Sequence, residues 1–173
     1  MNKVVLILVA LLVYEVSAVK QGWPTIQSHL HFAQRAKSTN GNSADILNAC
    51  RMKTHCITAF VAPWCPVCKS SVSSFRLVAA YLKKYRKDVG LNIVVGAASV
   101  SENNKEAEHL QPLKVVADND GEIMKAERIE AFPTWVVRDK AGREIFRKAG
   151  GLQIAQESQV EMLLHELIPE NHL

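Results

Sequence analysis

Short apolar runs alternate with a helical pattern along the first half of the chain. Residues 55–61 (HCITAFV) and 91–98 (LNIVVGAA) have the length and composition of buried strands. Between them, residues 66–85 carry apolar side chains at helical spacing, which predicts one helix that begins at Pro66. The predicted buried stripe of this helix contains Cys68, Val72, Phe75, Ala79 and Leu82.

The next part of the chain predicts three short elements. A polar segment at residues 101–110 reads as a helix capped by Ser101. A short strand is expected at residues 114–117. A short helix is expected at residues 122–128, after the turn-forming residues 118–121 (DNDG). Strands and helices therefore continue to alternate.

The end of the chain predicts a hairpin and a closing helix. Residues 134–138 and 143–148 read as two strands joined by the turn at residues 139–142 (DKAG). Residues 155–168 form an amphipathic pattern, with Val160, Leu163, Leu164 and Leu167 on one side. This order of elements predicts an α/β fold in which helices flank a central mixed β-sheet.

Composition and charge fit one folded domain. The chain has 173 residues, of which 48% are apolar, enough for a hydrophobic core. The net charge is only +4, and the basic cluster at residues 83–87 falls at a predicted helix end, where cations are favourable. No aromatic residues alternate with basic ones, so we expect no nucleic-acid partner. The six histidines lack metal-ligand spacing, and we expect neither a metal nor a cofactor.

The first 18 residues have the layout of a cleaved signal peptide. A positive residue, Lys3, precedes an unbroken apolar run at residues 4–13, and residues 16–18 (VSA) form a small-residue cleavage sequence. An uncleaved N-terminal anchor is the alternative, and only then would the protein contact a membrane. Both interpretations place the protein outside the cytoplasm, in the periplasm or secreted.

These features divide the chain into three parts. Residues 1–18 are the signal peptide or anchor, residues 19–44 an N-terminal extension, and residues 45–173 the folded domain. The domain would open with a short helix that ends near Cys50 and is capped by Asp45 or Ser43.

Cys65 and Cys68 are the candidate reactive residues. They flank Pro66-Val67 at the point where a predicted strand passes into a helix. Two thiols at this spacing can close into a small reversible disulfide, and the helix N-terminus would stabilise the Cys65 thiolate. We therefore predict disulfide exchange with the cysteines of other proteins, with Cys65 as nucleophile and Cys68 as the resolving thiol.

Two further cysteines, Cys50 and Cys56, precede this pair. Four cysteines allow three complete pairings, and their even number suits an oxidising compartment. We predict the local pairs, with Cys50–Cys56 as a structural disulfide that stabilises by about 2 kcal/mol. Two alternatives remain open. One is a second redox pair that passes electrons to Cys65–Cys68, and the other is a four-cysteine zinc site, although the spacing departs from the common zinc patterns.

Two separated motifs resemble the thioredoxin-fold family. The first is residues 60–68 (FVAPWCPVC), and the second is residues 131–137 (AFPTWVV), which precede the DKAG turn. Together they are similar to the secreted or periplasmic thiol–disulfide oxidoreductases of the TlpA/ResA-like group. The likeness covers residues 45–168 by order of elements and implies a thioredoxin-like three-layer sandwich.

The resemblance also implies roles for residues beside the cysteine pair. Pro133 would have a cis peptide bond, face the disulfide and present backbone groups of Phe132 to an extended substrate peptide. Phe132 would form a wall of the substrate groove, and Trp64 would shield one side of the pair. The chain departs from cytoplasmic thioredoxins at Ala59, where they carry a buried acid that assists proton transfer. Candidate replacements are Glu102, Glu127 and Glu130.

The expected function is thiol–disulfide exchange with protein substrates outside the cytoplasm, in the direction of reduction. An upstream redox protein would be the second partner. The alternatives are the same chemistry run as dithiol oxidation or disulfide isomerisation, and a thioredoxin-fold binding or assembly module whose cysteines are structural.

Overall fold

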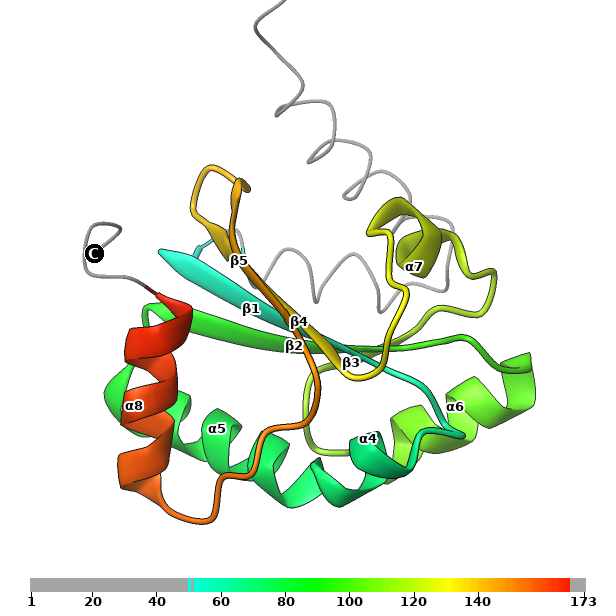
Figure 1. Ribbon diagram of the computed structural model, residues 1–173, viewed down its shortest axis with the longest axis horizontal. Helices are drawn as coiled ribbons and strands as arrows, with labels where there is room; N and C mark the ends of the chain where they lie inside the picture. Colours follow the sequence, from blue (N-terminus) through cyan, green and yellow to red (C-terminus); the bar gives the residue numbers. More distant parts are fainter. Residues whose placement is uncertain (1–49, 51, 169–173) are drawn as a thin grey trace, which may run out of the picture.

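A five-stranded mixed sheet forms the centre of the protein (Figure 1). The computed structural model describes residue 50 and residues 52–168. Its strands lie in the order β3-β2-β1-β4-β5. They are β1 (His55–Val61), β2 (Val89–Val95), β3 (Val115–Ala117), β4 (Thr134–Asp139) and β5 (Glu144–Ala149).

β1 is the middle strand, and its neighbours run in opposite directions. β2 pairs with β1 in parallel, with His55 beside Val89 and Val61 beside Val95. β4 pairs with the other side of β1 in antiparallel register, and β5 follows β4 as its hairpin partner. A strand covered on both faces needs apolar side chains in both directions, which explains the nearly continuous apolar run of β1.

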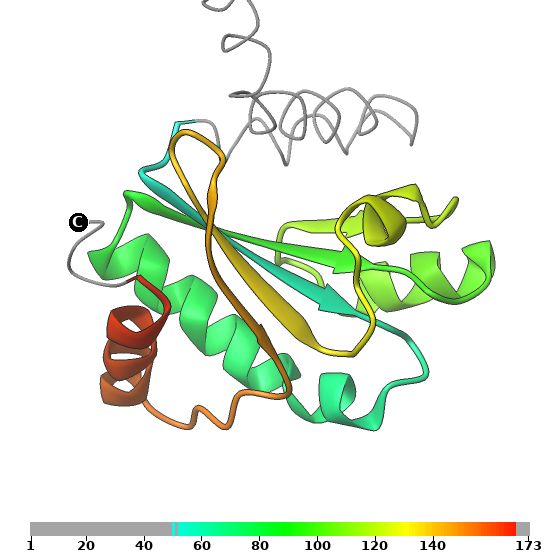
Figure 2. The same ribbon diagram turned by 45° about the horizontal axis from the view of Figure 1, so that its top comes forward.

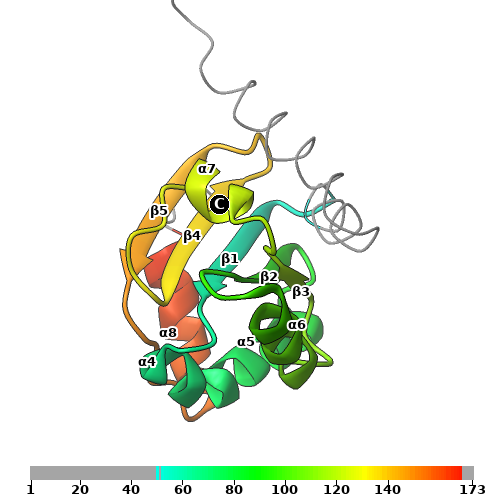
Figure 3. The ribbon, with the colours of Figure 1, turned by 90° about the vertical axis from the view of Figure 1, so that its right-hand side faces the viewer.

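Helices cover both faces of the sheet and complete three layers (Figures 2 and 3). α5 and α8 lie on one face, where Phe75 of α5 packs on Trp135 of β4 with ring centroids 5.2 Å apart. α7 covers the opposite face. The predicted α/β three-layer sandwich is confirmed. The helices are α4 (Pro66–Ser70), α5 (Val72–Tyr85), α6 (Val100–His109), α7 (Glu122–Ala126) and α8 (Glu157–Leu167).

The single helix predicted at residues 66–85 is in fact two helices, α4 and α5. The hydroxyls of Ser70 and Ser71 both donate to the carbonyl oxygen of Val67, at 3.0 and 2.8 Å. Side-chain donors of this kind compete with backbone N–H groups for the carbonyl and bend a helix. Within α5 the predicted burial of Ala79 is wrong, because Val78 is fully buried and Ala79 only half-buried.

The cap of α6 also differs from the prediction. Ser99, and not Ser101, is the N-cap residue. The N–H of Glu102 donates to the Ser99 hydroxyl at 3.4 Å, and the Glu102 carboxylate accepts from the Ser99 N–H at 3.1 Å. This reciprocal capping box satisfies two backbone donors at once. Ser101 cannot form one, because no acidic residue lies three positions after it.

The other predicted elements lie within a few residues of their expected positions. β1 matches residues 55–61, and the four apolar residues predicted for the last helix are all buried in α8. The predicted signal peptide or anchor (1–18), the extension (19–44) and the cap at Asp45 or Ser43 fall outside the described residues. None of the described helices is long and apolar enough to cross a membrane.

Candidate active site

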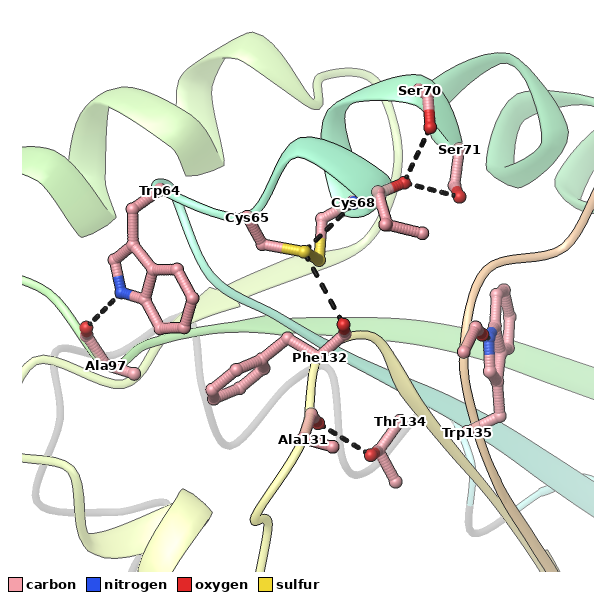
Figure 4. Close-up of a disulfide and its surroundings, with 12 residues drawn as sticks. Trp64, Cys65, Cys68, Ser70, Ser71, Ala97, Ala131, Phe132, Thr134 and Trp135 are labelled. Atoms are coloured by element: carbon pink, nitrogen blue, oxygen red, sulfur yellow. Dashed lines mark hydrogen bonds between the residues drawn. A yellow bond between two sulfur atoms is a disulfide. The ribbon is translucent and has the colours of Figure 1, made fainter.

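The Cys65–Cys68 disulfide lies where the loop after β1 enters α4 (Figure 4). Its Cα atoms are 5.3 Å apart, and only 4% of Cys65 and 2% of Cys68 are exposed. Pro66 occupies the start of α4, as predicted. The pair therefore lies at the carboxyl end of a central strand, where open α/β sheets usually place their sites.

A backbone amide of α4 contacts the sulfur of Cys65. Cys65 is the N-cap residue of this helix, and the N–H of Cys68 donates to its Sγ at 3.1 Å. A donor at a helix start favours a thiolate over a thiol because it meets the sulfur with partial positive charge. Lys69, the nearest basic residue in sequence, is exposed to solvent. The local geometry therefore favours negative charge on Cys65.

Phe132 presents its backbone carbonyl to the disulfide. The carbonyl oxygen lies 3.6 Å from Cys65 Sγ (Figure 4). The Phe132–Pro133 peptide bond is cis. The Thr134 hydroxyl donates to the Ala131 carbonyl at 2.7 Å and so joins this loop to the first residue of β4. The loop of the second motif therefore faces the cysteine pair with backbone groups, which an extended peptide can pair with.

Apolar side chains form the rim of the site. Trp64 is 59% exposed, and its ring meets the Phe132 ring edge to face with centroids 5.4 Å apart. Its Nε1 donates to the Ala97 carbonyl at 2.7 Å, which fixes the indole (Figure 4). Val67, between the two cysteines, is 46% exposed. Exposed apolar groups around a buried reactive bond are typical of a surface that contacts a partner chain.

The loop that holds Trp64 depends on a buried asparagine. Ala97 has a φ of 61°, in the left-handed region that non-glycine residues seldom adopt. The side chain of Asn103 is fully buried, and its Nδ2 donates to the carbonyls of Ala98 at 3.2 Å and Asp118 at 3.3 Å. Asn103 thereby joins the Trp64-binding loop to the segment after β3.

Ala59 occupies the position of the thioredoxin acid, and it is fully buried on β1. Glu102 belongs to the cap of α6, and the hydrogen bonds of that cap lower its pKa. Glu127 forms an ion pair with Arg138 at 2.6 Å, and Glu130 is exposed. Among the described residues, the carboxylates of Glu102 and Glu127 accept hydrogen bonds from Ser99 and Arg138 and not from the cysteine pair.

A second disulfide joins Cys50 and Cys56 at the opposite end of β1, with Cα atoms 5.6 Å apart. Cys56 is the second residue of β1, so about 16 Å of strand separates it from the end that leads to Cys65. The four cysteines thus form two distant pairs. This geometry argues against both a four-cysteine zinc site and direct electron transfer between the pairs.

The family of the chain follows from its sequence match. The Redoxin family matches residues 21–164. The chain belongs to the Redoxin family. With a thioredoxin-like fold and paired cysteines, it is a thioredoxin-like oxidoreductase, and the resemblance indicated by its two motifs is confirmed. No curated protein matches this Redoxin chain.

Solved structures of several bacterial proteins share the fold of this Redoxin chain. StoA from Bacillus subtilis is 25% identical, with a TM-score of 0.51 over 64% of this chain and 82% of StoA. A secreted disulfide oxidoreductase of Mycobacterium tuberculosis, homologous to DsbE of E. coli, is 18% identical, with a TM-score of 0.52 over 67% and 84%. The exposed lipoprotein thioredoxin Etrx1 of Streptococcus pneumoniae is 19% identical, with a TM-score of 0.52 over 68% and 87%.

Three residues near the two disulfides were not predicted from the sequence. Ala97 binds the Trp64 indole through its backbone carbonyl, and because every residue type has this group, the sequence gives no signal for it. Asn103 lies in a polar helix, where one more amide does not stand out. Asn92, which contacts both sulfurs of Cys50–Cys56, did give a signal, since it interrupts the apolar run of β2.

Proposed function

We propose that this Redoxin chain reduces disulfides of protein substrates outside the cytoplasm, through Cys65 and Cys68. The observation that carries the proposal is the N–H of Cys68, which donates to Cys65 Sγ at 3.1 Å. This donor favours the Cys65 thiolate, and thiolates are the attacking species in disulfide exchange. Phe132 supports a different part of the proposal, a peptide-binding site, because its backbone carbonyl lies 3.6 Å from the reactive sulfur.

The reaction would proceed in two exchanges. The Cys65 thiolate attacks one sulfur of a substrate disulfide, and the other substrate sulfur leaves as a thiolate. Cys68 then attacks Cys65 Sγ, so that the substrate leaves as a dithiol and Cys65–Cys68 is oxidised. An upstream redox protein returns two electrons to the pair. The short separation of the two Cα atoms, 5.3 Å, lets Cys68 reach Cys65 without movement of the backbone.

The surroundings of the pair favour an extended peptide as substrate. Trp64, Val67 and Phe132 form an apolar rim, and the Phe132–Pro133 loop offers backbone groups for strand addition. A folded surface would meet a disulfide that is almost completely buried. An unfolded or locally opened substrate can instead bring its own sulfur to Cys65.

The proposed location rests on the signal-like residues 1–18, with a membrane anchor as the alternative. Secreted and exposed proteins are among the structural neighbours, which is compatible with this location. The proposed direction rests on the resemblance to the TlpA/ResA-like group. A reduction potential near −270 mV would support a reductase, and one near −120 mV would support the oxidant alternative.

The test is reduction of insulin disulfides by the full chain and its cysteine variants. Cys65→Ser should lower the rate by roughly 10³-fold or more, because it removes the thiolate that forms the mixed disulfide in the proposed reaction. Cys68→Ser should accumulate a mixed disulfide through Cys65. The matched control, Cys50→Ser with Cys56→Ser, should keep activity. If Cys65→Ser retains the wild-type rate, the chain is a binding module and the proposed reaction is wrong.

A further inference from the structure

One cysteine of the Cys50–Cys56 disulfide, Cys50, lies in the wall of a cavity. Cys50 lines a cavity of about 450 Å³, a size typical of small-molecule sites. The cavity lies along β2 residues 89–92, whose outer edge is not paired by any described strand. At Gly90 a Cβ atom would come within 3.1 Å of Cys50 Sγ, so the glycine leaves room for the sulfur. Both cysteines are half-buried and hence more exposed than Cys65 and Cys68.

A buried side-chain amide points at the two sulfurs. Asn92 is 2% exposed, and its Nδ2 lies 2.8 Å from Cys50 Sγ and 3.4 Å from Cys56 Sγ. Its Oδ1 has no hydrogen-bond partner among the described residues. A disulfide sulfur is a weak acceptor, whereas a thiolate is a strong one. Reduction of the disulfide would therefore improve the hydrogen bonding of Asn92, which stabilises the reduced form.

The cavity is also positively charged. Its described lining includes no acidic residue and four lysines: Lys53, Lys83, Lys87 and Lys114. The ammonium of Lys53 donates to the carbonyl of Lys87, which holds one charge beside the cavity. Lysines in such an arrangement raise the local concentration of anions and lower the pKa of a nearby thiol. Apolar residues such as Leu82 and Leu113 line the rest.

We propose that Cys50–Cys56 is a second redox-active disulfide, reduced from this cavity by small thiols that carry carboxylate groups. Cys50 lines the cavity and is the sulfur that the small thiol would attack. Asn92 donates a hydrogen bond that would stabilise the reduced form, and the lysines would favour an anionic thiol. The disulfide still stabilises the fold when oxidised, so the structural role predicted from the sequence is retained for that state alone.

The exchange needs two equivalents of thiol. A thiolate in the cavity attacks Cys50 Sγ, the bond between the two cysteine sulfurs breaks, and Cys56 Sγ leaves as a thiolate. Asn92, 3.4 Å away, donates to this developing charge. A second thiolate then attacks the sulfur of the bound small molecule and releases Cys50 as a thiolate. The small thiol is oxidised to its own disulfide, and the cysteine pair gains two electrons.

The test uses the full chain with Cys65→Ser and Cys68→Ser, so that Cys50–Cys56 is its only disulfide. The separate location of the two pairs makes this test independent of the proposed function. The probes are 3-mercaptopropionate, 2-mercaptoethanol and cysteamine, which are anionic, neutral and cationic. Rates of reduction are measured by thiol labelling and mass spectrometry. Each rate is divided by the rate of the same thiol with the urea-unfolded chain, which removes differences in thiolate fraction and in intrinsic nucleophilicity.

We expect the anionic thiol to react about tenfold faster than the cationic one. Lys83→Glu should remove this preference. Its matched control is Lys84→Glu, at the neighbouring position of α5, which does not line the cavity and should leave the preference unchanged. Equal normalised rates for the three thiols, or equal effects of the two lysine variants, would overturn the assignment of the cavity.

A second variant tests the donor. Asn92→Ala should shift the equilibrium with 3-mercaptopropionate toward the disulfide by about tenfold, which is about 30 mV for a two-electron couple. Urea unfolding of the oxidised forms checks that both proteins are folded. If the disulfide of the folded chain resists millimolar thiol and is reduced only when urea unfolds the protein, it is a structural cross-link and the proposal is wrong.

Discussion

The two ends of β1 carry the same chemical group, a disulfide, in contrasting surroundings. At the carboxyl end, Cys65 Sγ accepts a backbone N–H within an apolar rim. At the amino end, Cys50 Sγ and Cys56 Sγ accept a side-chain amide beside four lysines. The S–S bond is common to both ends, so a difference in reaction partner must come from the neighbouring groups. These groups underlie the two proposals, an extended peptide at the carboxyl end and a small anionic thiol at the amino end.

Each end also contains a buried asparagine whose Oδ1 has no partner among the described residues. Asn103 uses its Nδ2 on two carbonyls and holds the backbone loop that fixes Trp64. The Nδ2 of Asn92 instead lies within hydrogen-bonding distance of both sulfurs of the Cys50–Cys56 disulfide. We therefore expect Asn103 to affect the stability of the fold and Asn92 to affect the reduction of the Cys50–Cys56 disulfide.

The largest stability effect is expected for Asn103→Ala. The substitution removes one buried and one partly buried hydrogen bond and leaves two carbonyls without that donor, so the free energy of unfolding should fall by about 2–3 kcal/mol. Urea unfolding measures this loss. Asn104→Ala, at the exposed next position of α6, removes only an exposed hydrogen bond from Asn119 and should change the value by less than about 1 kcal/mol. Equal losses would show that the buried amide does not hold the loop.

Removal of the amino-end disulfide should have the next largest effect. Cys50→Ser with Cys56→Ser should lower the free energy of unfolding by about 2 kcal/mol, because the short loop between the cysteines gains freedom mainly in the unfolded chain. Chemical denaturation of the oxidised wild type and the variant provides the comparison. An unchanged unfolding free energy would mean that this disulfide has no structural role even when oxidised.

Asp88 makes the amino end sensitive to acid. Arg86 donates to its carboxylate at 3.0 and 2.9 Å, and these bonds hold the pKa of Asp88 at about 2, below the ordinary 3.8. Because the folded pKa is the lower one, the stabilisation is complete above about pH 4 and is lost as the pH falls toward about 2.

Asp88→Asn should therefore destabilise the protein at neutral pH and have little effect in strong acid. The side chain is 40% exposed, so solvent screens the ion pair and we expect a loss of about 1 kcal/mol. Unfolding measured across this pH range gives the result. A loss of the same size at pH 7 and in strong acid would rule out the ion pair as its cause.

The smallest effect is expected for Trp64→Ala at the carboxyl end. Loss of the aromatic contact with Phe132 and with a bound peptide should raise KM for a peptide disulfide by about fivefold with little change in kcat. Met162→Ala removes a similarly exposed apolar side chain from α8 and should leave KM unchanged. A fall in kcat alone would place Trp64 in the chemical step.

The fold was largely predictable because most helices and strands have regularly spaced apolar residues that become buried. The strand at residues 55–61 and the apolar side of α8 follow directly from hydrophobic periodicity. The break between α4 and α5 at Ser71 could not be predicted in this way, because it depends on which carbonyl accepts the hydrogen bonds of the Ser70 and Ser71 hydroxyls. The cap of α6 was misplaced by two residues for a related reason: the partner of Ser99 is found three positions later.

The sequence predicted the reactive cysteines better than the residues that contact them. The spacing of Cys65 and Cys68 is local, so their proximity could be read from the chain. The contact of Phe132 with Cys65 joins residues 67 positions apart and was accessible only through a family resemblance. Asn92 and Cys50, 42 positions apart, have no family motif and required the three-dimensional structure.

The central claim is that the backbone N–H of Cys68, which donates to Cys65 Sγ, makes Cys65 the nucleophile of the carboxyl-end pair. Its most direct test is the pH dependence of alkylation by iodoacetamide, in the reduced full chain carrying Cys50→Ser and Cys56→Ser. We predict that Cys65 is alkylated first and that its pKa lies below the 8.5 of a free thiol. Earlier alkylation of Cys68, or a Cys65 pKa near 8.5 or above, would contradict the account.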